Sequence, residues 1–176
     1  TVEGKAFVKA TGGKIRTDRM QDRDFATRFV AFYLIDYSDY EPDMDSFLNK
    51  GMGKIKSLSN EQMQKLKDDF RAAMELAWDV FGEDAFRKRV NSHQPKKPIN
   101  KAIFEVFSVL FAKLSELQRL EIRARKSILK EHFKLNLLIP GNLYLTSLST
   151  GTALKEMVQY RFTFTEMLIK QNLPNA

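Results

Sequence analysis

In this 176-residue chain, the side chains best suited to bind a ligand are lysines and arginines that occur in clusters. The first cluster consists of Arg87, Lys88 and Arg89, followed after a short gap by Lys96 and Lys97. Contact with a phosphate backbone needs mobile cations gathered on one surface, so this cluster predicts a nucleic-acid interface. A solvated charged face without a ligand is the alternative interpretation. No helix-turn-helix or RNP-like motif accompanies the cluster, so no reading of base sequence is predicted.

A second basic set runs from Arg119 to Lys134 and is partly offset by Glu121 and Glu131. The whole chain has a formal net charge of +7 and a sequence pI of about 9.5, which favours an acidic partner such as DNA. Net charge bears on association and not on fold. A basic domain that is merely soluble therefore stays open as an interpretation.

Side chains for catalysis or metal binding do not converge in the sequence. His93 and His132 lie far apart. A metal site would need further ligands at defined spacing, and a general base would need an orienting partner. We therefore expect ordinary surface histidines, and neither a metal nor a cofactor. Neighbouring carboxylates are interpreted as helix caps or solvated side chains: Asp22/Asp24, Asp43/Asp45 and Asp68/Asp69.

The segment Ser149-Thr150-Gly151-Thr152 precedes a helical pattern, where free backbone N–H groups favour an anion. It lacks the Gly-Lys-Ser/Thr ending of a P-loop. We therefore prefer a turn between two helices, with Thr152 as the cap of the last one.

Helices must position these side chains. Apolar residues recur at steps of three and four, and no run alternates with the two-residue period of a strand. Ser59 with Gln62, and Ser115 with Gln118, have the spacing of capping boxes. The sequence therefore predicts an all-α fold, an irregular bundle of six to eight helices.

The expected domain organisation is simple. Residues 1–17 contain Gly12-Gly13 and are predicted to be a flexible or partly ordered lead-in, and residues 18–176 to form a single helical domain. Within that domain, Asn91 to Pro98 is expected to be a loop. Helices are expected from Asp18 to about Tyr33, Met44 to Ile55, Asn60 to Phe81, Asp84 to Val90, Ile99 to Leu114, Ser115 to about Leu137, and Thr152 to about Ile169.

The amino-acid composition indicates in which cellular compartment the protein resides. Hydrophobic residues make up 43% and charged residues 29%, as in an ordinary globular protein. The absence of Cys excludes disulfides and thiolate metal sites and fits a reducing compartment such as the cytoplasm. No apolar run approaches the roughly 20 residues that span a bilayer, so no membrane contact is expected. The start is no signal peptide and lacks an initiator Met, which fits an excised domain.

The run from Arg19 to Tyr33 joins alternating charges to a dense aromatic face. Phe25, Phe29 and Phe32 fall on one helical stripe, and Asp24 has the spacing to pair with Arg28. The run resembles the "RM-x-D-r-e-F-x-x-R-F-x-A-F-Y" stretch of the GmrSD-type family. Further segments match that family in the same order, from about Phe7 onward: Met44 to Asn49, Phe81 to Arg87, Pro98 to Val106, and Ser149 to Thr152.

The resemblance implies a role in defence. Proteins of the GmrSD-type family carry an Asp-Gly-Gln-Gln-Arg motif in an N-terminal ParB/sulfiredoxin-like half, which is associated with nucleotide-dependent DNA cleavage or nicking in bacterial defence against phage. This chain lacks that motif. It therefore resembles the helical region after the catalytic half, without a catalytic residue of its own, and would contact that half, another subunit or the DNA backbone.

Four residues match the family pattern and are interpreted as structural, as parts of a salt-bridged helix start over an aromatic core: Arg19, Asp22, Arg23 and Arg28. A stand-alone helical module for protein interaction or oligomerisation, without nucleic-acid contact, is the alternative function. An independent enzyme is the least favoured, because no convergent constellation of reactive groups is apparent.

Overall fold

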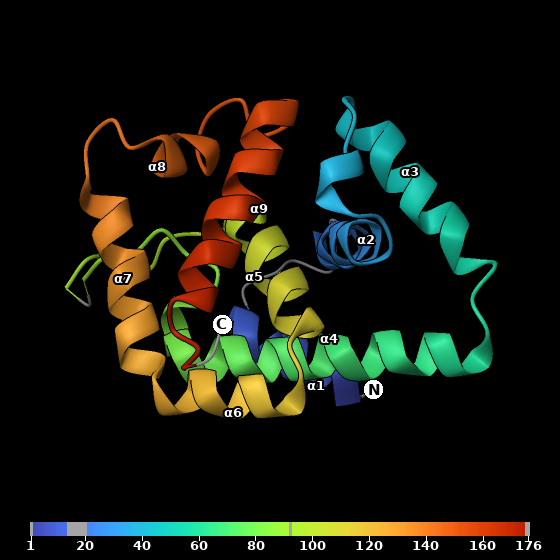
Figure 1. Ribbon diagram of the computed structural model, residues 1–176, viewed down its shortest axis with the longest axis horizontal. Coiled ribbons are helices and arrows are strands. Elements are labelled where there is room, and N and C mark those ends of the chain that lie inside the picture. The colour runs from blue at the N-terminus through green and yellow to red at the C-terminus, as the bar shows by residue number, and fades with distance from the viewer. Residues whose placement is uncertain (1, 14–20, 92, 175–176) are drawn as a thin grey trace.

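A computed structural model describes residues 2–13, 21–91 and 93–174 (Figure 1). These ranges contain nine α-helices, eight of them with seven or more residues, and no strand, which confirms the predicted all-α bundle. None of these helices is long and apolar enough to cross a membrane. The helices are α1 (Val2–Thr11), α2 (Gln21–Leu34), α3 (Met44–Ile55), α4 (Asn60–Phe81), α5 (Lys101–Lys113), α6 (Glu116–Ala124), α7 (Lys126–Leu138), α8 (Leu143–Ser147) and α9 (Lys155–Lys170), with 3-10 turns η2 (Tyr37–Asp39) and η3 (Gly82–Asp84).

Helix α4 forms the base of the bundle, with α1 and α6 packed along it (Figure 1). Helix α5 rises from this base and is buried from Ala102 to Ala112. A helix that is apolar on nearly every side belongs in the interior. Helices α2, α4 and α9 pack directly on α5.

Local signals in the sequence set where several helices begin. The predicted capping boxes at Ser59 and Ser115 are both present. The Asp43 carboxylate accepts a hydrogen bond from the Ser46 N–H and so caps α3, as expected. Such caps satisfy backbone donors that a helix leaves without partners in its first turn.

Aromatic side chains join the helices inside the bundle. Phe25, Phe29 and Phe32 of α2 are all buried, as their spacing predicts. The Phe32 ring lies between Phe47 of α3 and Phe162 of α9, at centroid distances of 4.6 and 4.9 Å. Contacts of this kind stabilise a core beyond the area that they bury.

The predicted flexible or partly ordered lead-in at residues 1–17 contains a helix that the sequence pattern did not indicate. Residues 2–11 form α1, and the Phe7 ring lies 6.0 Å from Phe70 and 6.1 Å from Phe104. Such a short helix has little stability of its own and depends on its packing against α4. The sequence pattern gives no information about this packing, so it did not predict the helix. Residues 14–17 of the lead-in and the Asp18 cap lie outside the described residues.

Three further boundaries differ from the prediction. The helix expected from Asp84 to Val90 is absent, because Phe86 takes a left-handed φ of 60° just after η3. The helix expected from Ser115 to Leu137 is interrupted at Arg125, which separates α6 from α7. Thr152 does not cap α9; that helix begins after Leu154, which makes no side-chain capping bond.

Candidate functional site

The predicted cluster of five basic residues does not stay together on the surface. The Arg87 side chain points inward and is 3% exposed. Its guanidinium donates hydrogen bonds to the carbonyl oxygens of Glu83 (3.1 Å), Lys97 (3.0 Å) and Thr11 (2.9 Å). These bonds tie α1 to the loop before α5. Because Arg87 is turned away from solvent, we remove it from the candidate nucleic-acid interface.

Lys96 is exposed and the Arg89 side chain is only 10% exposed, and each of them is paired with a carboxylate. Arg89 Nη1 lies 2.7 Å from Asp84 Oδ1, and Arg89 Nε donates to the Gln94 carbonyl. Lys96 Nζ lies 2.8 Å from Glu83 Oε2, and the hydrogen bond from Lys96 lowers the pKa of that carboxyl group. A phosphate group would have to compete with these carboxylates.

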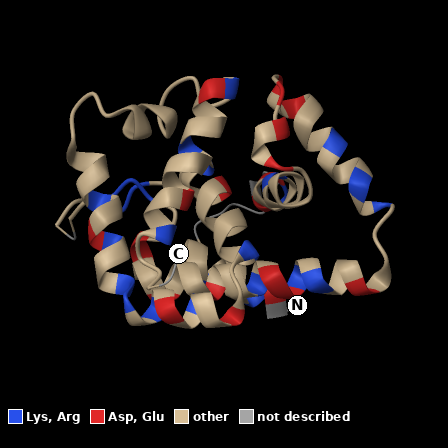
Figure 2. Cartoon of the chain, viewed as in Figure 1, with Lys and Arg blue, Asp and Glu red and all other residues tan. Residues whose placement is uncertain are grey.

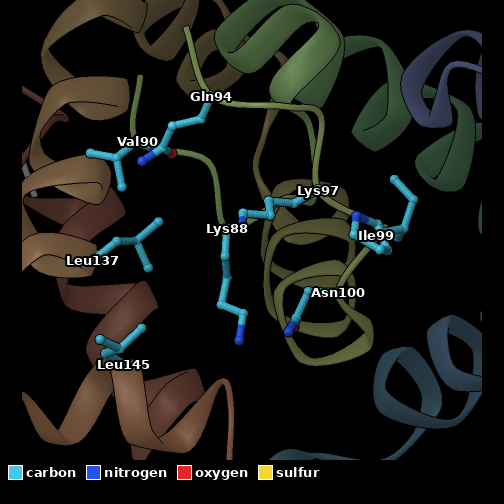
Figure 3. Close-up of a pocket in the computed structure, with 9 residues that line it drawn as sticks. Lys88, Val90, Gln94, Lys97, Ile99, Asn100, Leu137 and Leu145 are labelled. Atoms are coloured by element: carbon cyan, nitrogen blue, oxygen red, sulfur yellow. The ribbon is translucent and has the colours of Figure 1, made fainter. Parts of the chain in front are cut away.

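Lys88 and Lys97 are the two residues of the cluster that line an open pocket. The pocket has a volume of about 560 Å³ (Figure 3). No carboxylate of the described residues lies within ion-pair distance of either ammonium group. Both lysines belong to the segment between η3 and α5, where Figure 2 shows several blue stretches of loop. The structure thus brings these two charges together at one cavity.

The walls of this Lys88–Lys97 pocket come from distant parts of the chain. Leu137 of α7 and Leu145 of α8 lie on one side of Lys88, and Asn100 lies on the other (Figure 3). Lys88 Nζ lies 3.0 Å from Ser149 Oγ, so it reaches the loop that follows α8. Ser149, which the sequence singled out as an anion-binding candidate, is therefore a neighbour of Lys88.

Asn100 was not predicted as a pocket residue, because the helix was expected to begin at Ile99, whereas Asn100 is the cap of α5 in the structure. Its side-chain oxygen accepts from the Ile103 N–H, and its amide donates to the Leu148 carbonyl at 2.9 Å. This second bond fixes the loop near Ser149 relative to the start of α5. Two ammonium groups and an amide beside an apolar wall suit a phosphate attached to a less polar group.

The family-pattern residues lie elsewhere. Arg28 Nε lies 3.1 Å from Asp24 Oδ1, which confirms the predicted pair, and Arg28 Nη1 lies 2.5 Å from Glu105 Oε1. Burial lowers the pKa of Arg28, but Glu105 and Asp24 outweigh it and raise the pKa overall. Asp22 is half-buried and Arg23 is exposed. Arg19 lies outside the residues that the structure describes.

Glu105 joins Arg28 to a second arginine. Arg161 is fully buried, and its Nη2 lies 2.5 Å from Glu105 Oε2 while its Nη1 donates to the Thr152 carbonyl at 2.6 Å. Guanidinium groups therefore hold both oxygens of Glu105, and the residue is 1% exposed, so its carboxylate does not face solvent. One Glu within the apolar run of α5 was the available sequence signal, but spacing along the chain does not identify its partners.

The histidines are separate in the fold as well. His93 lies in the loop before α5, while His132 lies on α7 beside Asn172, with 3.5 Å between His132 Nδ1 and Asn172 Nδ2. Among residues 2–13, 21–91 and 93–174, no group of three or more His, Cys, Asp or Glu side chains is placed to hold a metal ion.

Comparisons with protein-family models, with curated proteins and with solved structures gave no match to this chain. The GmrSD-type resemblance therefore stays a prediction that rests on the motifs of the sequence.

Proposed function

We propose that this chain is a non-catalytic helical domain of a GmrSD-like anti-phage restriction protein, and that the Lys88–Lys97 pocket contacts the backbone of DNA. The pair of ammonium groups at an open pocket, without a carboxylate partner in the described part of the chain, is the observation that carries the DNA contact. The net charge of +7 favours the same partner. The order of the sequence motifs supports the family assignment.

A backbone contact suits the chemistry of the pocket. Lysine ammonium groups bind phosphate as mobile point charges, and contacts to phosphate position a protein without reading sequence. The Ser149 hydroxyl accepts a hydrogen bond from Lys88 and donates one to the Leu145 carbonyl, so it holds the Lys88 ammonium group at the pocket. The apolar side chains of Leu137 and Leu145 can face the sugar. We therefore expect binding that depends strongly on salt and weakly on base sequence.

In this proposal the domain holds DNA for a catalytic partner, either a ParB-like half of the same protein or another subunit, in the cytoplasm. We assign no catalytic role to the chain, since its sequence lacks the Asp-Gly-Gln-Gln-Arg motif.

The test is binding of fluorescein-labelled duplex DNA, followed by anisotropy over a series of salt concentrations. Combining Lys88→Ala with Lys97→Ala should weaken binding about three- to tenfold and make the log–log salt slope shallower by about 1 to 2, since each lost phosphate contact removes about 0.9. The matched control combines Lys50→Ala with Lys56→Ala, two exposed lysines at α3. Helix α3 lies at the opposite edge of the bundle from the pocket loop (Figure 1).

Equal weakening by the two double variants would attribute binding to net charge and reject the pocket. A wild-type protein that does not bind duplex DNA even at low salt would reject the nucleic-acid role. The stand-alone interaction module would then be the better function.

A further inference from the structure

A second groove lies on another side of α7 from the Lys88–Lys97 pocket. It has a volume of about 380 Å³, and Val90 contributes to both cavities. Leu135 and Leu138 of α7 line this groove and are 50% and 57% exposed. Single exposed leucines are common on protein surfaces, but two beside one groove form a small apolar face. We call this site the α7 groove.

Charged side chains flank the apolar face. Lys130 and Lys134 line the α7 groove, and both approach Asp84, at 3.8 and 3.4 Å. Asp84 also pairs with Arg89, so three cations share one carboxylate. Glu131 lines the groove as well and supplies one negative charge. The cations still outnumber the carboxylates, which leaves an excess of positive charge.

The lysines would benefit from a further counter-charge. Burial and the neighbouring charge of Lys134 lower the pKa of Lys130, and Asp84 only partly opposes this effect. An additional carboxylate at this place would relieve the repulsion between the two ammonium groups.

We infer that the α7 groove docks an acidic amphipathic helix of a partner protein, with its apolar side chains over Val90, Leu135 and Leu138 and its carboxylates toward Lys130 and Lys134. Helices bind such grooves through apolar anchors spaced three and four residues apart. Charges at the rim of an interface set the choice of partner and the rate of encounter.

Two other occupants fit less well. A second copy of this chain bound through a two-fold axis would place the groove against itself, so lysines would meet lysines. Nucleic acid would satisfy the lysines, but its sugars would cover Leu135 and Leu138, which are far more exposed than Leu137 of the other pocket, less completely than an apolar helix face would. An acidic amphipathic helix satisfies the charges and the apolar side chains together.

The probe for the test is a fluorescein-labelled helical peptide of about 16 residues, with leucines on one face and glutamates beside them. A second peptide carries lysine in place of every glutamate. With the complete chain, the acidic peptide should bind with a micromolar Kd, and the basic peptide at least about tenfold more weakly.

A pair of double variants locates the binding. Leu135→Ala with Leu138→Ala should weaken binding of the acidic peptide about tenfold, because apolar contact area is lost. Leu117→Ala with Leu120→Ala, on α6, is the matched control and should leave the affinity unchanged. Leu117 and Leu120 are 67% and 54% exposed, so neither double variant removes a core side chain.

Several outcomes would overturn the inference. These are no binding of the acidic peptide up to about 1 mM, equal affinity for both peptides, or equal weakening by the two double variants. A dimer that Leu135→Ala with Leu138→Ala dissociates would assign the groove to a second copy. The Lys88 and Lys97 variants should bind the peptide normally, so failure of the DNA proposal can be told apart from failure here.

Discussion

Asp84 is the most heavily shared charge of the basic surface. Its carboxylate lies 2.7 Å from Arg89 Nη1 and 3.4 Å from Lys134 Nζ, and the side chain is only 11% exposed. Burial raises the pKa of Asp84, but the hydrogen bond from Arg89 and the charges of Lys134 and Lys130 outweigh it, so the pKa is lowered overall. Asp84 therefore holds α7 against the turn after η3 as an anion.

Replacement of Asp84 should make the free energy of unfolding less dependent on pH in the acidic range. A carboxyl group with a lowered pKa stabilises the fold above its ordinary value, here 3.8, and loses that effect as the pH falls through the lowered pKa. At about pH 6, Asp84→Asn should cost about 1–3 kcal/mol of the free energy of unfolding, because its cations lose their partner. This difference from wild type should shrink toward about pH 3.

Urea unfolding at a series of pH values measures this effect. The control is Asp68→Asn, which removes an exposed carboxylate paired with Arg71, and it should cost less than about 1 kcal/mol. A cost of Asp84→Asn that is the same at every pH would contradict the assigned role.

Adjacent basic residues show why a charge cluster in the sequence predicts a candidate site only in part. Arg87 and Lys88 are neighbours, yet Arg87 bonds three carbonyls in the interior while Lys88 lines the pocket. The carbonyl of Thr11 and the hydroxyl of Ser149 are brought to them by tertiary packing. Composition therefore predicts a basic surface, and only the fold separates its structural charges from its accessible ones.

Helices α2 and α3 approach each other through their smallest residues. Gly51 of α3 is buried against Ala31 of α2, and a Cβ atom built on Gly51 would lie 2.5 Å from Ala31 Cα and 2.6 Å from Ala31 Cβ. The backbone of α2 cannot move aside as a flexible side chain would. The contact thus requires glycine for space, although glycine weakens a helix.

Two alanine substitutions distinguish the effect of steric clash on stability from the effect of helix propensity. Gly51→Ala should lower the free energy of unfolding by about 1–3 kcal/mol because of the clash with Ala31. Gly53→Ala has no neighbouring atom within 4 Å of the new Cβ and should stabilise the protein by up to about 1 kcal/mol. Chemical denaturation measures both, and a stabilising Gly51→Ala would show that the two helices are not held at this distance.

Helices with strong local signals were predictable and others were not. The Ser59 and Ser115 capping boxes mark the starts of α4 and α6 correctly, because a cap involves only residues within one turn. The break at Arg125 and the left-handed Phe86 have no comparable signal, since both side chains suit a helix elsewhere. Helix α1 depends on contacts of Phe7 with distant rings.

Across the fold, one buried anion links three helices. Glu105 of α5 pairs with Arg28 of α2 and Arg161 of α9, and Arg161 also holds the Thr152 carbonyl. Thr152 lies in the loop between α8 and α9. The same loop contains Ser149, whose hydroxyl contacts Lys88 at the pocket. The interior charges therefore connect the packing of the bundle to the shape of the candidate site.

Glu105→Gln should be among the most damaging single changes in this protein. An amide keeps the shape of the carboxylate but removes its charge, so the Arg161 guanidinium would stay buried without an anion and Arg28 would keep only Asp24. Breaking a buried ion pair in this way costs about 3–5 kcal/mol. The measurement is the free energy of unfolding in urea, with two-state behaviour checked by two probes.

Two comparisons show whether charge is the cause. Glu156→Gln, at an exposed position of α9, should change stability by no more than about 0.5 kcal/mol. Replacing Arg28, Glu105 and Arg161 together by Met, Leu and Met should recover stability relative to Glu105→Gln alone, because no unpaired charge is then buried. If the triple variant is less stable than Glu105→Gln, the three helices depend on the hydrogen-bond geometry of the network, and removing the charges cannot replace it.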